Sequence, residues 1–115
     1  MSESGRHEEA ANCFLKAAHL APTDYEVVFS TAYALRQAAR NEEAERYYKQ
    51  AVRLRPNDVA SHMNLGAMLH VNGKLDEAES SYMKALELKP DDTLTQNNLA
   101  KLRHLLLQRR STGKR

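Results

Sequence analysis

The chain contains one cysteine, four glycines, three prolines and no tryptophan among its 115 residues. A single cysteine excludes an internal disulfide framework and a zinc site built from several cysteines. Glycine and proline are too scarce for an all-β protein with many turns, so the composition favours helices. No apolar run approaches the roughly 20 residues of a membrane span. Residues 1–10 also lack the apolar run of a secretory signal.

Charge is unevenly distributed along the chain. The formal net charge is +2, but residues 101–115 contain six basic residues and no acid, whereas residues 1–100 contain 11 basic and 15 acidic residues. A basic end can contact nucleic acid, anionic lipid or an acidic partner. No aromatic residue separates its basic positions, so stacking on bases has no support. We interpret residues 109–115 as a disordered basic tail and expect no nucleic-acid partner.

The sequence repeats with a period set by its prolines. Pro22, Pro56 and Pro90 lie 34 residues apart, and similar stretches precede each of them in the same register. This period is the signature of the tetratricopeptide repeat, and the chain resembles that family over nearly its full length. The best copy spans residues 59–92, with His62 in place of the usual aromatic residue. Its marker positions are Leu65, Gly66, Leu69, Gly73, Ala78, Tyr82, Ala85 and Pro90.

The resemblance implies an all-α fold, a right-handed α-solenoid of antiparallel helix pairs with a C-terminal capping helix. The apolar spacing predicts six helices, over residues 6–20, 25–38, 41–55, 59–72, 75–88 and 93–108. We expect one domain over residues 1–108, followed by the tail. Its parts are a partial repeat (1–24), two repeats (25–58 and 59–92) and the capping helix (93–108).

The first repeat lacks most of its first helix in this sequence. Phe14, Leu15 and Leu20 are therefore expected on an uncovered face. That face indicates a fragment or isoform of a longer array, a contact with a partner, or self-association through the incomplete repeat. Cys13 is expected to be a small buried or half-exposed residue, because no histidine is placed to activate its thiol.

By the family's register, one face of each first helix lines a concave groove. Apolar, amide and cationic side chains in such a groove suit an extended peptide, because asparagine can both donate to and accept from a peptide backbone. For Asn64 and Asn98, a hydrogen bond to the neighbouring repeat is the alternative interpretation. The predicted peptide-binding residues are Glu26, Phe29, Ser30, Tyr33, Arg36, Met63, Asn64, His70, Asn97, Asn98 and Lys101.

Some proteins of this family bind the C-terminal acid of heat-shock chaperones with a clamp of lysine, asparagine and arginine residues. Asn64 matches one position of that pattern. Phe29 and Tyr33 stand where lysine and asparagine are required, and Leu94 stands where another lysine is required. We therefore do not expect chaperone-tail binding.

Motifs of catalysis and metal binding are missing from the sequence. The five histidines are scattered, and acidic pairs recur at the start of each second helix, where they offset the helix dipole. No phosphate-binding glycine loop, nucleophile elbow or metal-ligand cluster occurs. We expect no enzyme activity, no cofactor and no metal. The leading interpretation is a noncatalytic module that binds a protein or an extended peptide, as the C-terminal part of a longer array that recruits acceptor or partner proteins.

Residues 51–75 and 89–99 also look like the C-terminal repeats of the transmembrane tetratricopeptide-containing O-mannosyltransferases. That resemblance implies a full-length dolichyl-phosphate-mannose-dependent protein O-mannosyltransferase that acts on cadherins, with its active site and membrane spans outside this segment. The chain would then be an accessory segment in the lumen of the endoplasmic reticulum; otherwise a cytoplasmic location is expected. A self-associating structural end cap is the further alternative.

Overall fold

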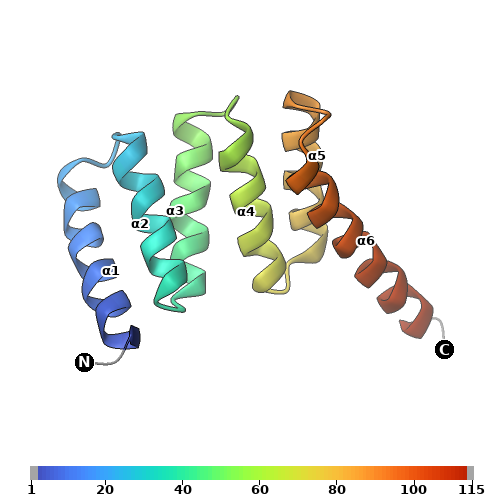
Figure 1. Cartoon of the computed structure of the whole chain (residues 1–115), viewed down its shortest axis with the longest axis horizontal. Coiled ribbons are helices and arrows are strands. Elements are labelled where there is room, and N and C mark those ends of the chain that lie inside the picture. Colours follow the sequence, from blue (N-terminus) through green and yellow to red (C-terminus); the bar gives the residue numbers. More distant parts are fainter. Residues whose placement is uncertain (1–2, 114–115) are drawn as a thin grey trace. The chain divides into compact units, whose positions relative to one another are not determined.

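The computed structural model describes residues 3–113, and this part of the chain contains six helices and no strand. Contacts divide the chain into two units, Met1–Asn57 and Asp58–Arg115, with three helices each (Figure 1). The helices of the first unit are α1 (Glu3–Leu20), α2 (Tyr25–Gln37) and α3 (Asn41–Leu54). Those of the second unit are α4 (Val59–Val71), α5 (Leu75–Leu88) and α6 (Thr93–Gly113).

In the first unit, α2 packs against both α1 and α3. The helix begins after Asp24, whose carboxylate accepts a hydrogen bond from the N–H of Val27 at 3.4 Å. Such a cap satisfies a backbone donor that the first turn leaves free. Apolar side chains at helical spacing are then fully buried, Val28, Ala32 and Leu35 among them.

In the second unit, α4 and α5 form an antiparallel pair, and α6 packs against α5 with a smaller contact to α4 (Figure 1). Gly66 sets the closest approach of the pair, because a Cβ at this position would lie 2.8 Å from the buried ring of Tyr82. The helix α6 buries one apolar stripe, made of Leu99, Leu102 and Leu106. This stripe covers the side of α5 that would otherwise face solvent.

The turns within the two helix pairs have the same backbone form. Gly73 takes φ 80°, and Ala39, 34 positions earlier, takes φ 60°. In each turn, the N–H of the following residue donates at 2.9 Å to a carbonyl five residues back, Arg40 to Leu35 and Lys74 to Leu69. Positive φ is natural for glycine and costly for alanine. The α2–α3 pair therefore keeps the glycine turn without the glycine.

The expected helices are present, and two of them differ from the predicted bounds by more than one residue. α1 begins at Glu3 rather than at residue 6, and α6 continues to Gly113 rather than ending at residue 108. The prediction of a disordered tail was therefore wrong for residues 109–113. No glycine or proline interrupts residues 93–112, and arginine favours helices. Residues 1–2 of the expected domain and 114–115 of the expected tail lie outside the described residues.

Cys13 is exposed, so the expectation of a buried or half-exposed thiol was also wrong. Phe14 and Leu20 are exposed as expected, whereas Leu15 is half-buried. Within residues 3–113, no helix combines the length and the apolar character that crossing a membrane requires.

Candidate functional site

The predicted groove residues fall into two sets, one in each unit. Five of them lie on α2, and the others lie on α4 and α6. Each set is described below with its own neighbours.

On α2, Tyr33 is the most accessible apolar side chain, with 54% of its surface exposed. Arg36 follows one turn later and is half-buried. Both side chains act electrostatically on the hydroxyl of Tyr48, which lies on α3: burial raises the pKa of Tyr48, and the positive charge of Arg36 opposes that rise. Arg36 and the exposed Tyr33 therefore lie near the hydroxyl of the fully buried Tyr48.

Phe29, in contrast, belongs largely to the packing of α2 on α3. Its ring centroid lies 5.6 Å from that of Tyr48 in an edge-to-face arrangement and 5.7 Å from that of Tyr25. Such aromatic contacts stabilise a helix pair. Ser30, on the next position of α2, is half-buried. Phe29 therefore contributes mainly to the packing of α2 on α3, and only part of its side chain is accessible.

Glu26, at the start of α2, is exposed and forms an ion pair with Arg55 at 3.5 Å. The Arg55 guanidinium also lies over the Tyr25 ring, 4.0 Å from its centroid. The sequence reasoning missed both Tyr25 and Arg55, because neither occupies a groove position in the repeat register. Their separation of 30 residues could have revealed the contact, because it places Tyr25 in the first turn of α2 and Arg55 at the end of α3, and these ends meet when the two helices pack antiparallel.

In the second unit, two predicted residues contact each other. The amide nitrogen of Asn98 on α6 donates to the sulfur of Met63 on α4 at 3.6 Å. The amide nitrogen of Asn64 donates to the carbonyl of Ala60 in its own helix at 2.8 Å. The alternative interpretation thus holds for Asn98, which bonds to the neighbouring first helix.

The remaining predicted residues differ in accessibility. His70 at the end of α4 is half-buried, whereas Asn97 and Lys101 on α6 are exposed. Asn97 and Lys101 are four positions apart, so they share one face of the helix. Among residues 3–113, no group of three histidine, cysteine, aspartate or glutamate side chains is placed to hold a metal ion.

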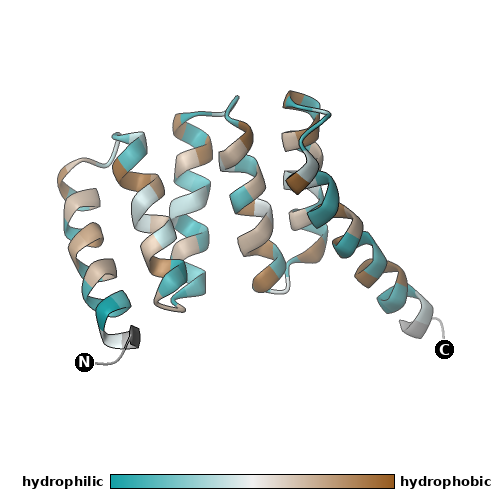
Figure 2. Ribbon diagram, viewed as in Figure 1, coloured by the Kyte–Doolittle hydropathy of each residue, from teal (hydrophilic) through white to brown (hydrophobic). Residues whose placement is uncertain are grey.

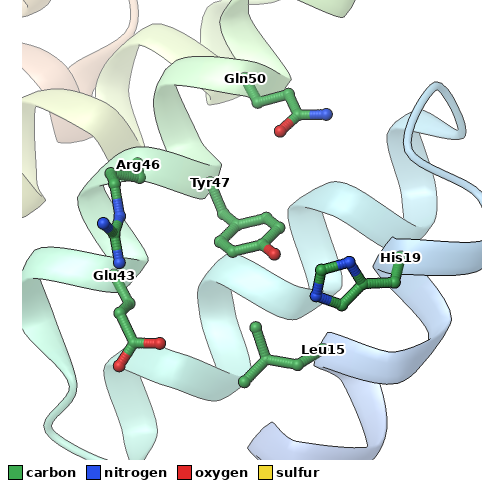
Figure 3. A pocket seen from close by; sticks show the side chains of 6 residues that line it. All are labelled: Leu15, His19, Glu43, Arg46, Tyr47 and Gln50. Carbon is green, nitrogen blue, oxygen red and sulfur yellow. The ribbon is translucent and has the colours of Figure 1, made fainter.

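A separate cleft of about 450 Å³ lies between α1 and α3, and the sequence reasoning missed it. Leu15 and His19 line it from α1, and the Tyr47 ring stands at its centre with the hydroxyl directed toward the α1 side chains (Figure 3). The other lining residues are Glu43, Arg46 and Gln50. The Gln50 side chain is already engaged, because it donates to the carbonyl of Pro22 at 2.6 Å.

Glu43 at the edge of this cleft is held by Arg40, the residue before α3. The Arg40 guanidinium donates two hydrogen bonds to Glu43, at 2.8 and 2.9 Å, and two more to Glu8 and Asn12 of α1, at 2.8 and 3.1 Å. The hydrogen bonds and charge of Arg40 lower the pKa of the Glu43 carboxyl. Arg40 therefore ties α1 to the start of α3.

Comparisons with known proteins agree with the helix-pair architecture. The family model described as tetratricopeptide repeat matches residues 2–58 and, in a second overlapping placement, residues 29–93. A search of curated protein sequences gave no match.

Solved structures of similar fold include three domains of RPAP3. The first tetratricopeptide domain of Spaghetti (RPAP3), bound to the HSP90 peptide SRMEEVD, has a TM-score of 0.81 and 27% identity over 90% of this chain and 82% of that chain. The first such domain of human RPAP3 has a TM-score of 0.81 and 26% identity, covering 93% and 84%. The second domain of human RPAP3, in complex with the HSP70 peptide SGPTIEEVD, has a TM-score of 0.78 and 24% identity, covering 86% and 82%, and shows the shared fold alone. The chain belongs to the tetratricopeptide repeat family.

Proposed function

We propose that this chain is a noncatalytic module that binds an extended peptide through the accessible faces of its first helices. The observation that carries the proposal is the likeness to the first tetratricopeptide domain of Spaghetti (RPAP3), a structure solved with a bound heptapeptide. The residues proposed to contact the ligand are Glu26, Phe29, Ser30, Tyr33, Arg36, Met63, Asn64, His70, Asn97, Asn98 and Lys101.

The chemistry of these side chains indicates what kind of peptide they would take. Tyr33 offers an exposed ring for an apolar or aromatic side chain, and its neighbour Arg36 offers a charged donor. On α6, Asn97 and Lys101 present an amide and a cation on one face. Amides hydrogen-bond to a peptide backbone without selecting its sequence. We expect selectivity to come from the ring of Tyr33.

The ligand proposed here is not the acidic chaperone tail seen in that relative. Two positions of the clamp require a lysine and an asparagine, and in this chain Phe29 and Tyr33 occupy them. Phe29 is also packed against the ring of Tyr48. Leu94, at a position that requires lysine, exposes 56% of its surface and has no charge. Without these donors, a terminal carboxylate would lose its hydration without gaining charged partners.

Peptides selected from a random 12-residue display library on the intact chain provide the test. The selected peptides and the heptapeptide SRMEEVD would be titrated by calorimetry against the chain and against Tyr33→Ala and Asn64→Ala variants. We expect Tyr33→Ala to weaken the selected peptides about tenfold, the size of losing one buried aromatic contact. Tyr47→Ala on α3 is the matched control and should leave affinity unchanged. Unchanged affinity of both Tyr33→Ala and Asn64→Ala for the selected peptides would refute the proposal that these helix faces bind the peptide.

The O-mannosyltransferase resemblance of residues 51–75 and 89–99 supports a second candidate function, an accessory lumenal segment of such an enzyme. The transcript upstream of Met1 tests it. An open reading frame with many apolar spans would support the enzyme assignment, and an in-frame stop codon would refute it.

Self-association through the incomplete first repeat is a third candidate, supported by the exposure of Phe14 and Leu20 on α1. Sedimentation velocity over a wide concentration range would test it. A monomer at every concentration would refute it.

A further inference from the structure

Each second helix of the array has the same apolar row on one face. The row contains alanine, an aromatic residue, alanine and leucine at spacings of four, three and three residues. These spacings place the four side chains along one side of a helix. The rows are Ala10, Phe14, Ala17 and Leu20 on α1; Ala44, Tyr48, Ala51 and Leu54 on α3; and Ala78, Tyr82, Ala85 and Leu88 on α5.

The three rows differ sharply in burial. Tyr48 on α3 is 0% exposed and Tyr82 on α5 is 1% exposed, and the alanines beside them are fully buried. On α1, Phe14 exposes 38% and Leu20 exposes 88% of its surface. Apolar colours run along the middle and last turns of α1 (Figure 2). The side of α1 that packs against α2 is a different one, with Ala11 and Ala18 buried there.

The two covered rows show what kind of helix this surface accepts. On α5 the row is covered by α4, which places Gly66 directly against the Tyr82 ring and has Leu65 and Leu69 on either side. On α3 the row is covered by α2, which has Ala32 at the corresponding place and Leu35 three residues later. Each covering helix therefore has a small residue at the place that faces the aromatic ring and a leucine three residues later.

We propose that the apolar row of α1 binds a helix of a partner protein, with the pattern large–small–x–x–large that α4 has at Leu65, Gly66 and Leu69. The small residue of that helix would lie against Phe14. Because Phe14 has no hydroxyl, the partner needs no polar group at that point. The interaction surface differs from the faces of the first helices that are proposed to bind a peptide.

A helix in this position also reaches α2. In the second unit, the contact between Asn98 and Met63 shows that the first helices of successive repeats touch each other. The residue of α2 that corresponds to Asn98 is Ser30, which is half-buried. The incoming helix would thus contact both α1 and the Ser30 side of α2. This arrangement would repeat on α1 and α2 the interface that joins α4, α5 and α6 within the second unit.

A second copy of this chain is a poorer occupant. The helices of a second copy that cover such rows, α2 and α4, already pack on their own partners, and α6 has Arg103 where the pattern needs an aliphatic residue. Pairing α1 with α1 of a second copy would join two helices about 27 Å long and 10 Å wide. The helix α1 itself lacks the large–small–x–x–large pattern that covers such a row.

The test uses the intact chain and a synthetic peptide of residues 57–74, acetylated and amidated, which supplies an α4-type helix with its cap and turn. Fluorescence anisotropy of the labelled peptide reports binding. We expect Phe14→Asp to weaken binding by at least about tenfold, because a carboxylate would be buried against an apolar helix. Leu107→Asp on α6, which also replaces an exposed apolar residue by aspartate, is the matched control and should bind as the unchanged chain does.

A peptide with Gly66→Leu is the second control, and it should not bind, because its side chain would collide with the Phe14 ring. The exposed thiol of Cys13 lies beside this row and supplies an independent signal: its rate of reaction with an aromatic disulfide should fall when the peptide binds. Absence of binding, or equal binding to the Phe14→Asp variant, would overturn the proposal. Protection of Cys13 that rises with protein concentration alone would overturn it in favour of a second copy. Since Tyr33→Ala leaves this surface intact, failure here and failure of the peptide-binding proposal are distinguishable.

Discussion

Gly66→Ala is the sharpest test of how the helix pairs pack. The new Cβ would lie 2.8 Å from two carbons of the Tyr82 ring, where ordinary contacts are 3.4–4 Å. The ring is 1% exposed and cannot turn into solvent, so α4 must move away from α5 by several tenths of an ångström. Overpacking of this kind costs about 1–3 kcal/mol. Alanine gains about 1 kcal/mol of helix propensity over glycine, so we expect a net loss of about 1 kcal/mol in the free energy of unfolding.

Urea unfolding followed by circular dichroism would measure this change, with thermal melting as a second readout. The size of the loss corresponds to a melting temperature lower by about 4 °C or more. In a Tyr82→Leu background the obstacle is gone, and Gly66→Ala should become neutral or stabilising. Ala32→Gly on α2 is the control at the matching position: it should destabilise by about 1 kcal/mol, because that Cβ is already accommodated. A more stable Gly66→Ala single variant would refute this packing argument.

Two further predictions concern the turns between the helices and the loss of stability at low pH. Ala39→Gly should raise the free energy of unfolding by about 1 kcal/mol, and Gly73→Ala should lower it by about the same amount. The reason is that both positions have positive φ, whereas a Cβ at Gly73 would meet no neighbour. Urea unfolding of both variants would measure the two changes, and changes of the same sign would contradict the prediction. Arg40 lowers the pKa of Glu43, so the contribution of this ion pair to the free energy of unfolding is complete above the ordinary value of 4.5 and is lost as pH falls through the lower folded pKa. Glu43→Gln should therefore make the stability less dependent on pH below 4.5, whereas Glu42→Gln should not. Thermal melts across that pH range would measure both.

Much of the fold could be predicted from the period, because small and aromatic residues recur where two helices meet. The burial of Tyr48 and Tyr82 and the close contact at Gly66 follow from that register. The end of α6 could not be placed in this way, since the period ends before it. The absence of a helix-breaking residue up to Gly113 was the better indicator, and the basic charge of residues 109–110 was the misleading one.

The candidate site was harder to predict than the fold, because register gives the direction of a side chain and not its partners. The ring of Phe29 packs edge-to-face on Tyr48, and Glu26 pairs with Arg55. The amide of Asn64 bonds within its own helix. Each of these depends on rotamers and on the neighbouring helix, which a single repeat copy does not encode.

The principal packing contacts within each unit join helices that are adjacent in the sequence. Chains with such local contacts close only short loops while folding, and they fold within microseconds to milliseconds. The helix α1 packs mainly on α2, and Arg40 holds it to the start of α3, while Gln50 bonds to Pro22 just after it. Its amide protons should therefore exchange with solvent faster than those of α5, which lies between two helices. A helix bound to α1 would therefore slow the exchange of the α1 amides more than that of the amides in the other helices.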